Sequence, residues 1–156
     1  MYKDASELMS QCKEQNKRIW QIAVENEMKL TSSSYEDILS RFDDRLEIMF
    51  HSAQKALNAK QATKGGLIDG VAKTQYDYSK KENISGEYIN YVMSLAYSCS
   101  EVNASMGKIC ASPTAGSCGI VPAVLLGLSQ AKNISREKTL EGLITASAVG
   151  AIYTKN

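Results

Sequence analysis

Apolar side chains recur at helical spacing along most of this chain, and no stretch alternates apolar and polar residues as a strand does. The spacing predicts helices over residues 4–29, 35–58, 71–81 and 85–102, one that starts at Pro122, and one from Ser135 onward. Ser34 followed by Asp37 is typical of a capping box at a helix start. We therefore expect an all-α fold, a compact multi-helix domain.

Two of these helices carry clear expectations about burial. The helix over residues 85–102 is expected to bury its apolar positions, which are Ile89, Val92, Met93, Ala96 and Cys99. The last helix is rich in small residues, which let helices approach closely, so we expect it to be buried on most sides. It runs to the end of the sequence without a closing turn, which suggests that residues 1–156 are a single domain of a longer protein.

The composition argues against several classes of function. The 18 Lys and Arg residues balance 17 Asp and Glu residues, so the charge suggests neither nucleic acid nor an acidic partner. No apolar stretch reaches membrane-spanning length and the first residues lack the apolar core of a secretory signal, so we expect a cytoplasmic protein. Its four cysteines have no CxxC spacing and are interpreted as reduced thiols. With His51 as the only histidine, Ser-His-Asp catalysis and multi-histidine zinc sites are hard to build, and we assign it no role.

The candidate functional site is the loop over residues 111–122, which reads A-S-P-T-A-G-S-C-G-I-V-P. Pro113 should keep a helix from running through it, while Gly116 and Gly119 permit positive φ or close approach to a ligand. Pro122 suits the first turn of the apolar helix that follows. The start of that helix would attract an anion and stabilise a thiolate at Cys118. The residues alone leave three interpretations of Cys118 open: a buried structural thiol, a redox or metal-binding thiol, and a nucleophile.

A second glycine-rich stretch, K-Q-A-T-K-G-G-L-I-D-G, covers residues 60–70. Its backbone N–H groups could bind an anion. The spacing matches neither the P-loop nor the dinucleotide-binding fingerprint, and no strand precedes it. Composition alone favours a plain connector.

Several motifs together resemble a known family, the α chain of the iron–sulfur-dependent L-serine dehydratases. They are Y-K-D-A-S-E-L at the start, S-G-E-Y-I-N in the middle, E-V-N-A-S-M-G-K-I, and A-S-P-T-A-G-S-C-G-I-V-P-A-V-L-L. The ending A-V-G-A-I-Y-T-K-N is similar to the family's segment just before a stretch that supplies more cysteines. The resemblance implies that residues 1–156 are the N-terminal part of the catalytic domain, truncated at the C-terminus. One motif departs from the family, which usually has S-G-L-x-G-G-D where this chain has K-G-G-L-I-D-G.

The resemblance also implies a chemistry, the conversion of L-serine to pyruvate and ammonia without pyridoxal phosphate. A four-iron four-sulfur (4Fe-4S) cluster held by three cysteines would act as a Lewis acid on the serine hydroxyl. Cys118 matches the first cluster-ligand position, and the other two ligands would lie beyond Asn156. Thr114, Gly116 and Ser117 would line the substrate pocket. Further positions that match the substrate-site motifs are Asn103, Ser105, Lys155 and Asn156. The sequence does not identify the general base.

The implied setting is amino-acid degradation and gluconeogenesis in the cytoplasm. The implied partners are L-serine and a separate β subunit, and a homo-oligomer is compatible with the resemblance. Neither nucleic acid nor a membrane is an implied partner. Because one thiolate cannot hold a cubane cluster, we expect this chain alone to be cluster-free and inactive. Two alternatives remain open at this stage, an L-cysteine desulfidase-type lyase of related architecture and a non-catalytic helical interaction module.

Overall fold

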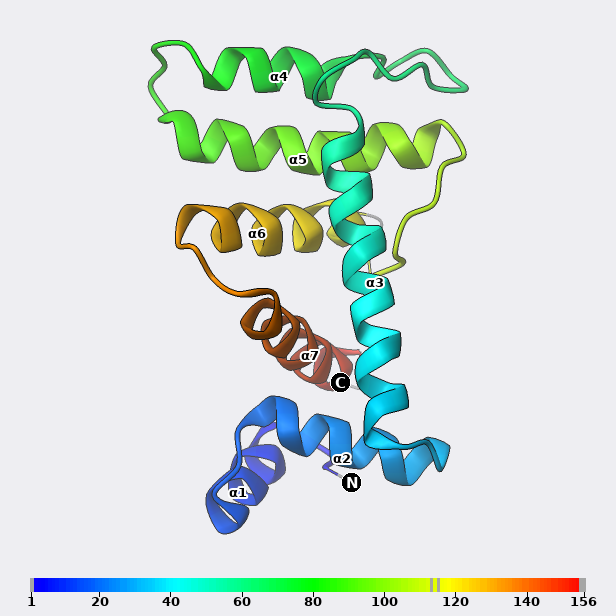
Figure 1. Cartoon of the computed structure of the whole chain (residues 1–156), viewed down its shortest axis with the longest axis vertical. Helices are drawn as coiled ribbons and strands as arrows, with labels where there is room; N and C mark the ends of the chain where they lie inside the picture. Colours follow the sequence, from blue (N-terminus) through cyan, green and yellow to red (C-terminus); the bar gives the residue numbers. More distant parts are fainter. Residues whose placement is uncertain (1, 113, 115, 155–156) are drawn as a thin grey trace. The chain divides into compact units, whose positions relative to one another are not determined.

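The computed structural model describes residues 2–112, 114 and 116–154, and this part of the chain is all helical, without a strand. The all-α prediction is confirmed (Figure 1). The helices are α1 (Ala5–Gln15), α2 (Ile19–Thr31), α3 (Tyr35–Lys55), α4 (Val71–Ser79), α5 (Glu87–Ala104), α6 (Ser117–Ala131) and α7 (Arg136–Tyr153).

The first predicted helix is wrong as a single element, because residues 4–29 contain the end of α1 and the start of α2. Asn16 has a φ of 50°, a left-handed conformation that asparagine tolerates better than most residues. The N–H of Lys17 then donates to the carbonyl of Cys12 at 3.0 Å, which closes the end of α1. No glycine or proline marks this break, so the apolar spacing predicts one helix through it.

Two compact units make up the chain. One unit comprises the residues up to Asp44 together with those from Arg136 onward, and the other comprises Arg45–Ser135. In the first unit α2 contacts α7, and a small core forms around Val24, Ile38 and Ile144. The capping box predicted at the start of α3 is confirmed, since the N–H of Asp37 donates to Ser34 Oγ at 3.1 Å. The prediction of a single domain stays a prediction.

In the second unit α5 lies between α4 and α6, and the C-terminal part of α3 crosses α5 and α6 (Figure 1). Its core consists of Ala53, Ala56, Leu57, Ala72, Leu95, Cys99, Ala123 and Leu126. The hydroxyl of Ser98 donates to the carbonyl of Ser52 at 2.7 Å, and the N–H of Ala56 donates to the same hydroxyl at 3.0 Å. These bonds join α3 to α5 through buried polar groups.

The face of α5 that is buried differs in part from the predicted one. Val92, Ala96 and Cys99 pack inside as expected. Ile89 and Met93 are instead 50% and 39% exposed. Four of the remaining buried positions of α5 are polar, namely Asn90, Ser94, Ser98 and Glu101, and the others are Leu95 and Val102. Hydrogen bonds make this burial tolerable, and those of Ser98 and Glu101 reach residues distant in the sequence, which apolar spacing cannot reveal.

The prediction that the last helix is buried on most sides is also wrong for this structure. One face of α7 is buried, through Thr139, Leu143, Ile144 and Ala148. The small residues on the other side, Gly142, Ala146, Ser147 and Ala151, are exposed.

Candidate functional site

The helix that follows the Pro/Gly-rich loop begins earlier than predicted. α6 starts at Ser117, so Pro122 lies inside the helix and not in its first turn. A proline there has no N–H to donate within the helix, which costs α6 one internal hydrogen bond near its start. The consequence for the site is that Cys118 belongs to the first turn of α6 instead of the loop before it.

Reciprocal hydrogen bonds between Thr114 and Ser117 explain the early start. The N–H of Thr114 donates to Ser117 Oγ at 3.0 Å, and the N–H of Ser117 donates to Thr114 Oγ1 at 3.3 Å. The reciprocal pattern is like that of a capping box, but it lies just before the helix, since the N-cap of α6 is Gly116 and has no side-chain cap bond. The hydroxyl of Ser117 also donates to the carbonyl of Thr114 at 2.7 Å. Both hydroxyls therefore have local partners, and binding a substrate would require them to exchange these bonds.

The two glycines of the loop serve different purposes from those expected. Gly116 has a φ of −74°, and a Cβ added there would meet nothing within 4 Å. Gly119 is buried where α6 approaches α5, and an added Cβ would lie 3.0 Å from the carbonyl oxygen of Ala96. Neither residue has the positive φ that the sequence allowed. The close approach at Gly119 is to a neighbouring helix.

This close approach places Cys118 near a second thiol, that of Cys99 on α5. Cys99 is fully buried, and its Sγ lies 3.5 Å from Ser52 Oγ. Burial raises the pKa of the Cys99 thiol to about 11, the hydrogen bond with Ser52 opposes this rise, and the neighbouring Cys118 adds to it. Cys118 is only half-buried. The start of α6 thus has one sequestered thiol and one accessible thiol.

The end of α5 lies at the same end of the helix pair as the start of α6. The two helices run antiparallel, since Ala96 faces Gly119 while Val92 faces Gly127. Asn103, in the last turn of α5, is exposed. Ser105 follows it and donates its hydroxyl to the carbonyl of Val102 at 2.9 Å.

The structure therefore brings six of the predicted site positions to one end of the α5–α6 pair. These are Asn103, Ser105, Thr114, Gly116, Ser117 and Cys118. Lys155 and Asn156, the other two predicted substrate-site positions, lie outside the described residues.

The glycine-rich stretch over residues 60–70 reaches the same end of α5. The N–H of Lys64 donates to the carbonyl of Ala104, the last residue of α5, at 2.9 Å. Within the stretch, the hydroxyl of Thr63 donates to Asp69 Oδ1 at 2.6 Å. Side-chain and backbone hydrogen bonds from Thr63 lower the pKa of Asp69. The connector is thus tied both to itself and to α5.

Glu101 is a potentially functional residue that the sequence analysis missed. It is fully buried on α5, and its Oε1 accepts a hydrogen bond from the N–H of Ala72 at 2.7 Å. Ala72 lies in the first turn of α4, where a carboxylate is favoured by the helix dipole. Within the described part of the chain, Oε2 has no hydrogen-bond partner. The signal in the sequence that could have identified Glu101 is its place as an acidic residue between two buried apolar positions, Cys99 and Val102.

The described residues do not fit a metal cluster on their own. In residues 2–112, 114 and 116–154, no three His, Cys, Asp or Glu side chains converge to hold a metal ion. Cys118 and Cys110 are both half-buried, and burial raises the pKa of the Cys110 thiol. Cys12 belongs to the other unit. A cluster at Cys118 would therefore need ligands from outside the described residues.

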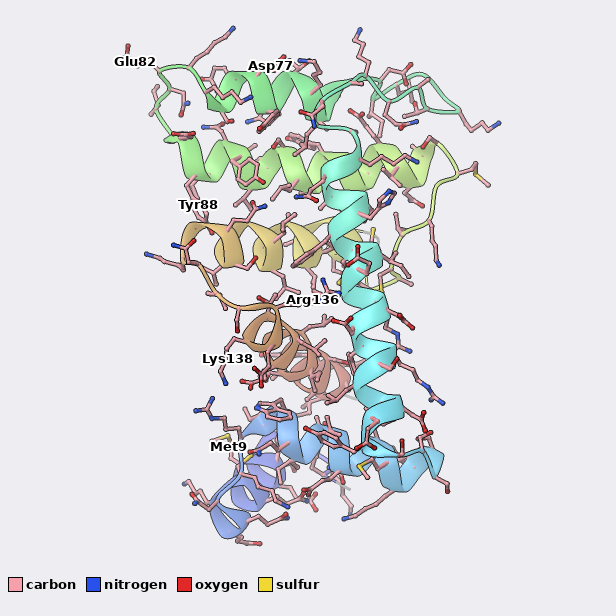
Figure 2. The ribbon with its side chains drawn as sticks, viewed as in Figure 1. Met9, Asp77, Glu82, Tyr88, Arg136 and Lys138 are labelled. Carbon is pink, nitrogen blue, oxygen red and sulfur yellow. The ribbon has the colours of Figure 1, made fainter. Side chains whose placement is uncertain are left out.

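A groove of about 410 Å³ lies in the first unit, lined in part by Met9 of α1 and Lys138 of α7 (Figure 2). Its remaining lining residues are Cys12, Lys17, Arg18, Ile19, Trp20, Glu141, Gly142 and Thr145. None of the predicted site residues that the structure describes contributes to it. None of the described helices is long and apolar enough to cross a membrane.

Comparisons with known proteins agree along nearly the whole chain. The family model described as serine dehydratase alpha chain matches residues 14–156. The chain is 37% identical to the "L-serine dehydratase, alpha chain" of Peptoniphilus asaccharolyticus, over 99% of this chain and 53% of that relative. It is 34% identical to the "Probable L-serine dehydratase, alpha chain" of Bacillus subtilis, over 100% of this chain and 52% of the relative. The chain thus spans about half the length of these curated relatives. No solved structure matches it significantly.

Proposed function

This chain belongs to the serine dehydratase α-chain family, and we propose that it works as part of an L-serine dehydratase, a lyase that converts L-serine to pyruvate and ammonia. The observation that carries the proposal is the family match over residues 14–156, which includes the loop with Cys118. The helical framework supports it, because two of the quoted motifs, E-V-N-A-S-M-G-K-I and A-S-P-T-A-G-S-C-G-I-V-P-A-V-L-L, meet at one end of the α5–α6 pair.

The reaction is a β-elimination, in which a proton leaves the α-carbon of serine and hydroxide leaves the β-carbon. Hydroxide is a poor leaving group, so the reaction needs an electrophile beside the β-oxygen. We propose that a 4Fe-4S cluster supplies this Lewis acid when it is bound, with Cys118 as one thiolate ligand and the others outside the described residues. No pyridoxal phosphate is needed in this scheme.

The chain's own residues would bind and orient the amino acid. The start of α6 presents backbone N–H groups and the positive end of a helix dipole, which suit the carboxylate of serine. Thr114 and Ser117 carry hydroxyls at that helix start and could transfer their hydrogen bonds to the same carboxylate. Asn103, Ser105, Gly116, Lys155 and Asn156 are further proposed members of the substrate site.

The remaining parts of the proposal concern the assembly. The first relatives are named α chains, and we propose that this chain likewise acts with a separate β subunit. We also propose that the enzyme works in the cytoplasm, in amino-acid degradation. Since the described residues supply one ligand thiol in place of a full set, the 156-residue chain alone is expected to be inactive.

The test is pyruvate formation by the complete enzyme carrying these residues, assayed anaerobically with L-serine and, separately, with L-cysteine. Cys118→Ser is expected to abolish turnover of serine, while Cys110→Ser, the matched control in the same unit, is expected to retain most of it. Retained activity in Cys118→Ser would refute the assigned role of Cys118. Faster turnover of L-cysteine than of L-serine by the unchanged enzyme would favour a desulfidase instead.

A further inference from the structure

The α5–α6 pair exposes six large apolar side chains that share one face, defined here as the α5–α6 face. On α5 they are Ile89, Met93 and Tyr97, which are 50%, 39% and 37% exposed. On α6 they are Ile120, Val124 and Leu128, which are 58%, 47% and 41% exposed. In both helices the three positions are four residues apart, so each set forms one stripe along its helix.

The geometry of the pair puts both stripes on the same side. α5 turns Val92, Ala96 and Cys99 toward α6, while the stripe of Met93 lies next to this contact line. On α6 the contact line runs through Gly119 and Gly127, and the stripe of Val124 lies next to it. In each helix the stripe is rotated about the helix axis from the contact line in the same sense. Because the helices are antiparallel, this rotation brings both stripes to the same side of the α5–α6 pair.

The part of α3 in this unit covers the opposite side of the pair. Ser98 of α5 bonds to Ser52 of α3, and it lies on the far side of α5 from the apolar stripe. α5 therefore buries serines and a glutamate toward its neighbours and leaves isoleucine, methionine and tyrosine exposed. Helices of a folded domain ordinarily bury apolar side chains and expose polar ones, and α5 does the reverse. Such a contiguous exposed apolar surface is typical of a site that binds another polypeptide.

The relatives supply the argument for what that partner is. The match covers 53% of the Peptoniphilus asaccharolyticus α chain and 52% of the Bacillus subtilis one, so each relative has a further portion nearly as long as this chain. We propose that the α5–α6 face is the docking surface for the polypeptide that corresponds to this further portion of the α chain. The proposal depends on family membership and holds whether or not the elimination chemistry is correct.

Chemical labelling of single sites tests the proposal. Val124→Cys places a thiol on the α5–α6 face, and Glu82→Cys places one at the exposed turn between α4 and α5 as a matched control (Figure 2). Each variant is treated with a maleimide as the 156-residue chain alone, and again after fusion to the unmatched portion of the Peptoniphilus asaccharolyticus α chain. Peptide mass mapping separates the new thiols from the four native ones. We expect fusion to slow labelling at position 124 at least tenfold and to leave position 82 unchanged.

Two labelling results would overturn the proposal. One is equal labelling at position 124 with and without the fused portion. The other is protection of position 124 in the chain alone that grows with protein concentration, which would make a second copy the occupant. Co-purification provides an independent measurement. The further portion, co-expressed as a separate polypeptide, is expected to be retained by the unchanged chain and lost with Ile120→Asp combined with Val124→Asp. Retention of the partner by this double variant, shown to be folded by circular dichroism, would also contradict the proposal.

Discussion

Cys99 and Cys118 lie close enough to influence each other electrostatically, although one is buried on α5 and the other is half-exposed in the first turn of α6. The pKa of the Cys99 thiol is raised to about 11, chiefly by burial, with the hydrogen bond to Ser52 opposing the rise and the neighbouring Cys118 contributing to it. The pair gives the site one inert thiol and one that reagents or a metal can reach.

Alkylation should distinguish these two thiols. At pH 8 a thiol with a pKa near 11 is ionised in about one molecule in a thousand, and Cys99 is also shielded from solvent. We expect iodoacetamide to modify Cys118 and to leave Cys99 intact in the folded chain, with both reacting in denaturing urea. Time-resolved peptide mass mapping measures this, and equal rates for both thiols in the folded chain would show that the predicted contrast is absent.

The contact at Gly119 should be intolerant of even one methyl group. A Cβ there would lie 3.0 Å from the backbone carbonyl of Ala96, which cannot rotate away. Gly119→Ala is expected to lower the free energy of unfolding by about 1–3 kcal/mol. Gly150→Ala in α7 is the matched control, because an added Cβ there meets nothing, and it should stabilise by about 0.5–1 kcal/mol. Urea unfolding followed by circular dichroism gives both values, and the same sign for the two variants would be inconsistent with a tight α5–α6 contact.

Glu101 should act as a side-chain cap for α4. Glu101→Ala removes the acceptor for the N–H of Ala72, whereas Glu101→Gln keeps a carbonyl oxygen in place. By the usual value of a cap, about 1–2 kcal/mol, exchange of the Ala72 amide should accelerate about 5- to 30-fold in the alanine variant and much less in the glutamine variant. Hydrogen exchange measured by NMR decides this, and unchanged protection in Glu101→Ala would remove the capping role.

The capping box of α3 should contribute to acid sensitivity. Hydrogen bonds from the Ser34 side chain and backbone, with a smaller effect of Arg41, lower the pKa of Asp37 below its ordinary value of 3.8. A folded-state pKa that is lowered adds stability above pH 3.8, and this stability is lost as the pH falls through the folded value. Urea midpoints at about pH 5 and about pH 2 should therefore differ less in Asp37→Asn than in the unchanged chain. Asp69 and Asp77 have lowered pKa values too, so the difference should shrink without vanishing. If the urea midpoint changes equally between the two pH values in both proteins, the Ser34–Asp37 capping box does not contribute to acid sensitivity.

Sequence patterns predicted those features that depend on neighbours along the chain. The helical class, the Ser34–Asp37 cap and the helix that became Val71–Ser79 are local, and apolar spacing and capping chemistry are sufficient for them. The buried position of Cys99 was also predicted correctly.

Some errors arose where contacts between distant residues decide the outcome. The bond between Ser98 and Ser52 makes a polar face of α5 suitable for burial. The early start of α6 was missed for a local reason, the reciprocal hydrogen bonds between Thr114 and Ser117. Glu101 is buried because it caps a helix that begins 30 residues earlier, which no local pattern shows. The Asn16 break lacked a glycine or proline signal.

The measurement that tests the central claim most directly is the iron bound per α chain after anaerobic reconstitution with iron and sulfide. The complete α chain is compared as the unchanged protein, as Cys118→Ser and as Cys110→Ser, with visible absorption recorded alongside. We expect a full cluster in the unchanged protein and in Cys110→Ser, and loss of most of the iron and of the brown colour in Cys118→Ser. Full iron loading of Cys118→Ser would contradict the assignment of this cysteine as a cluster ligand.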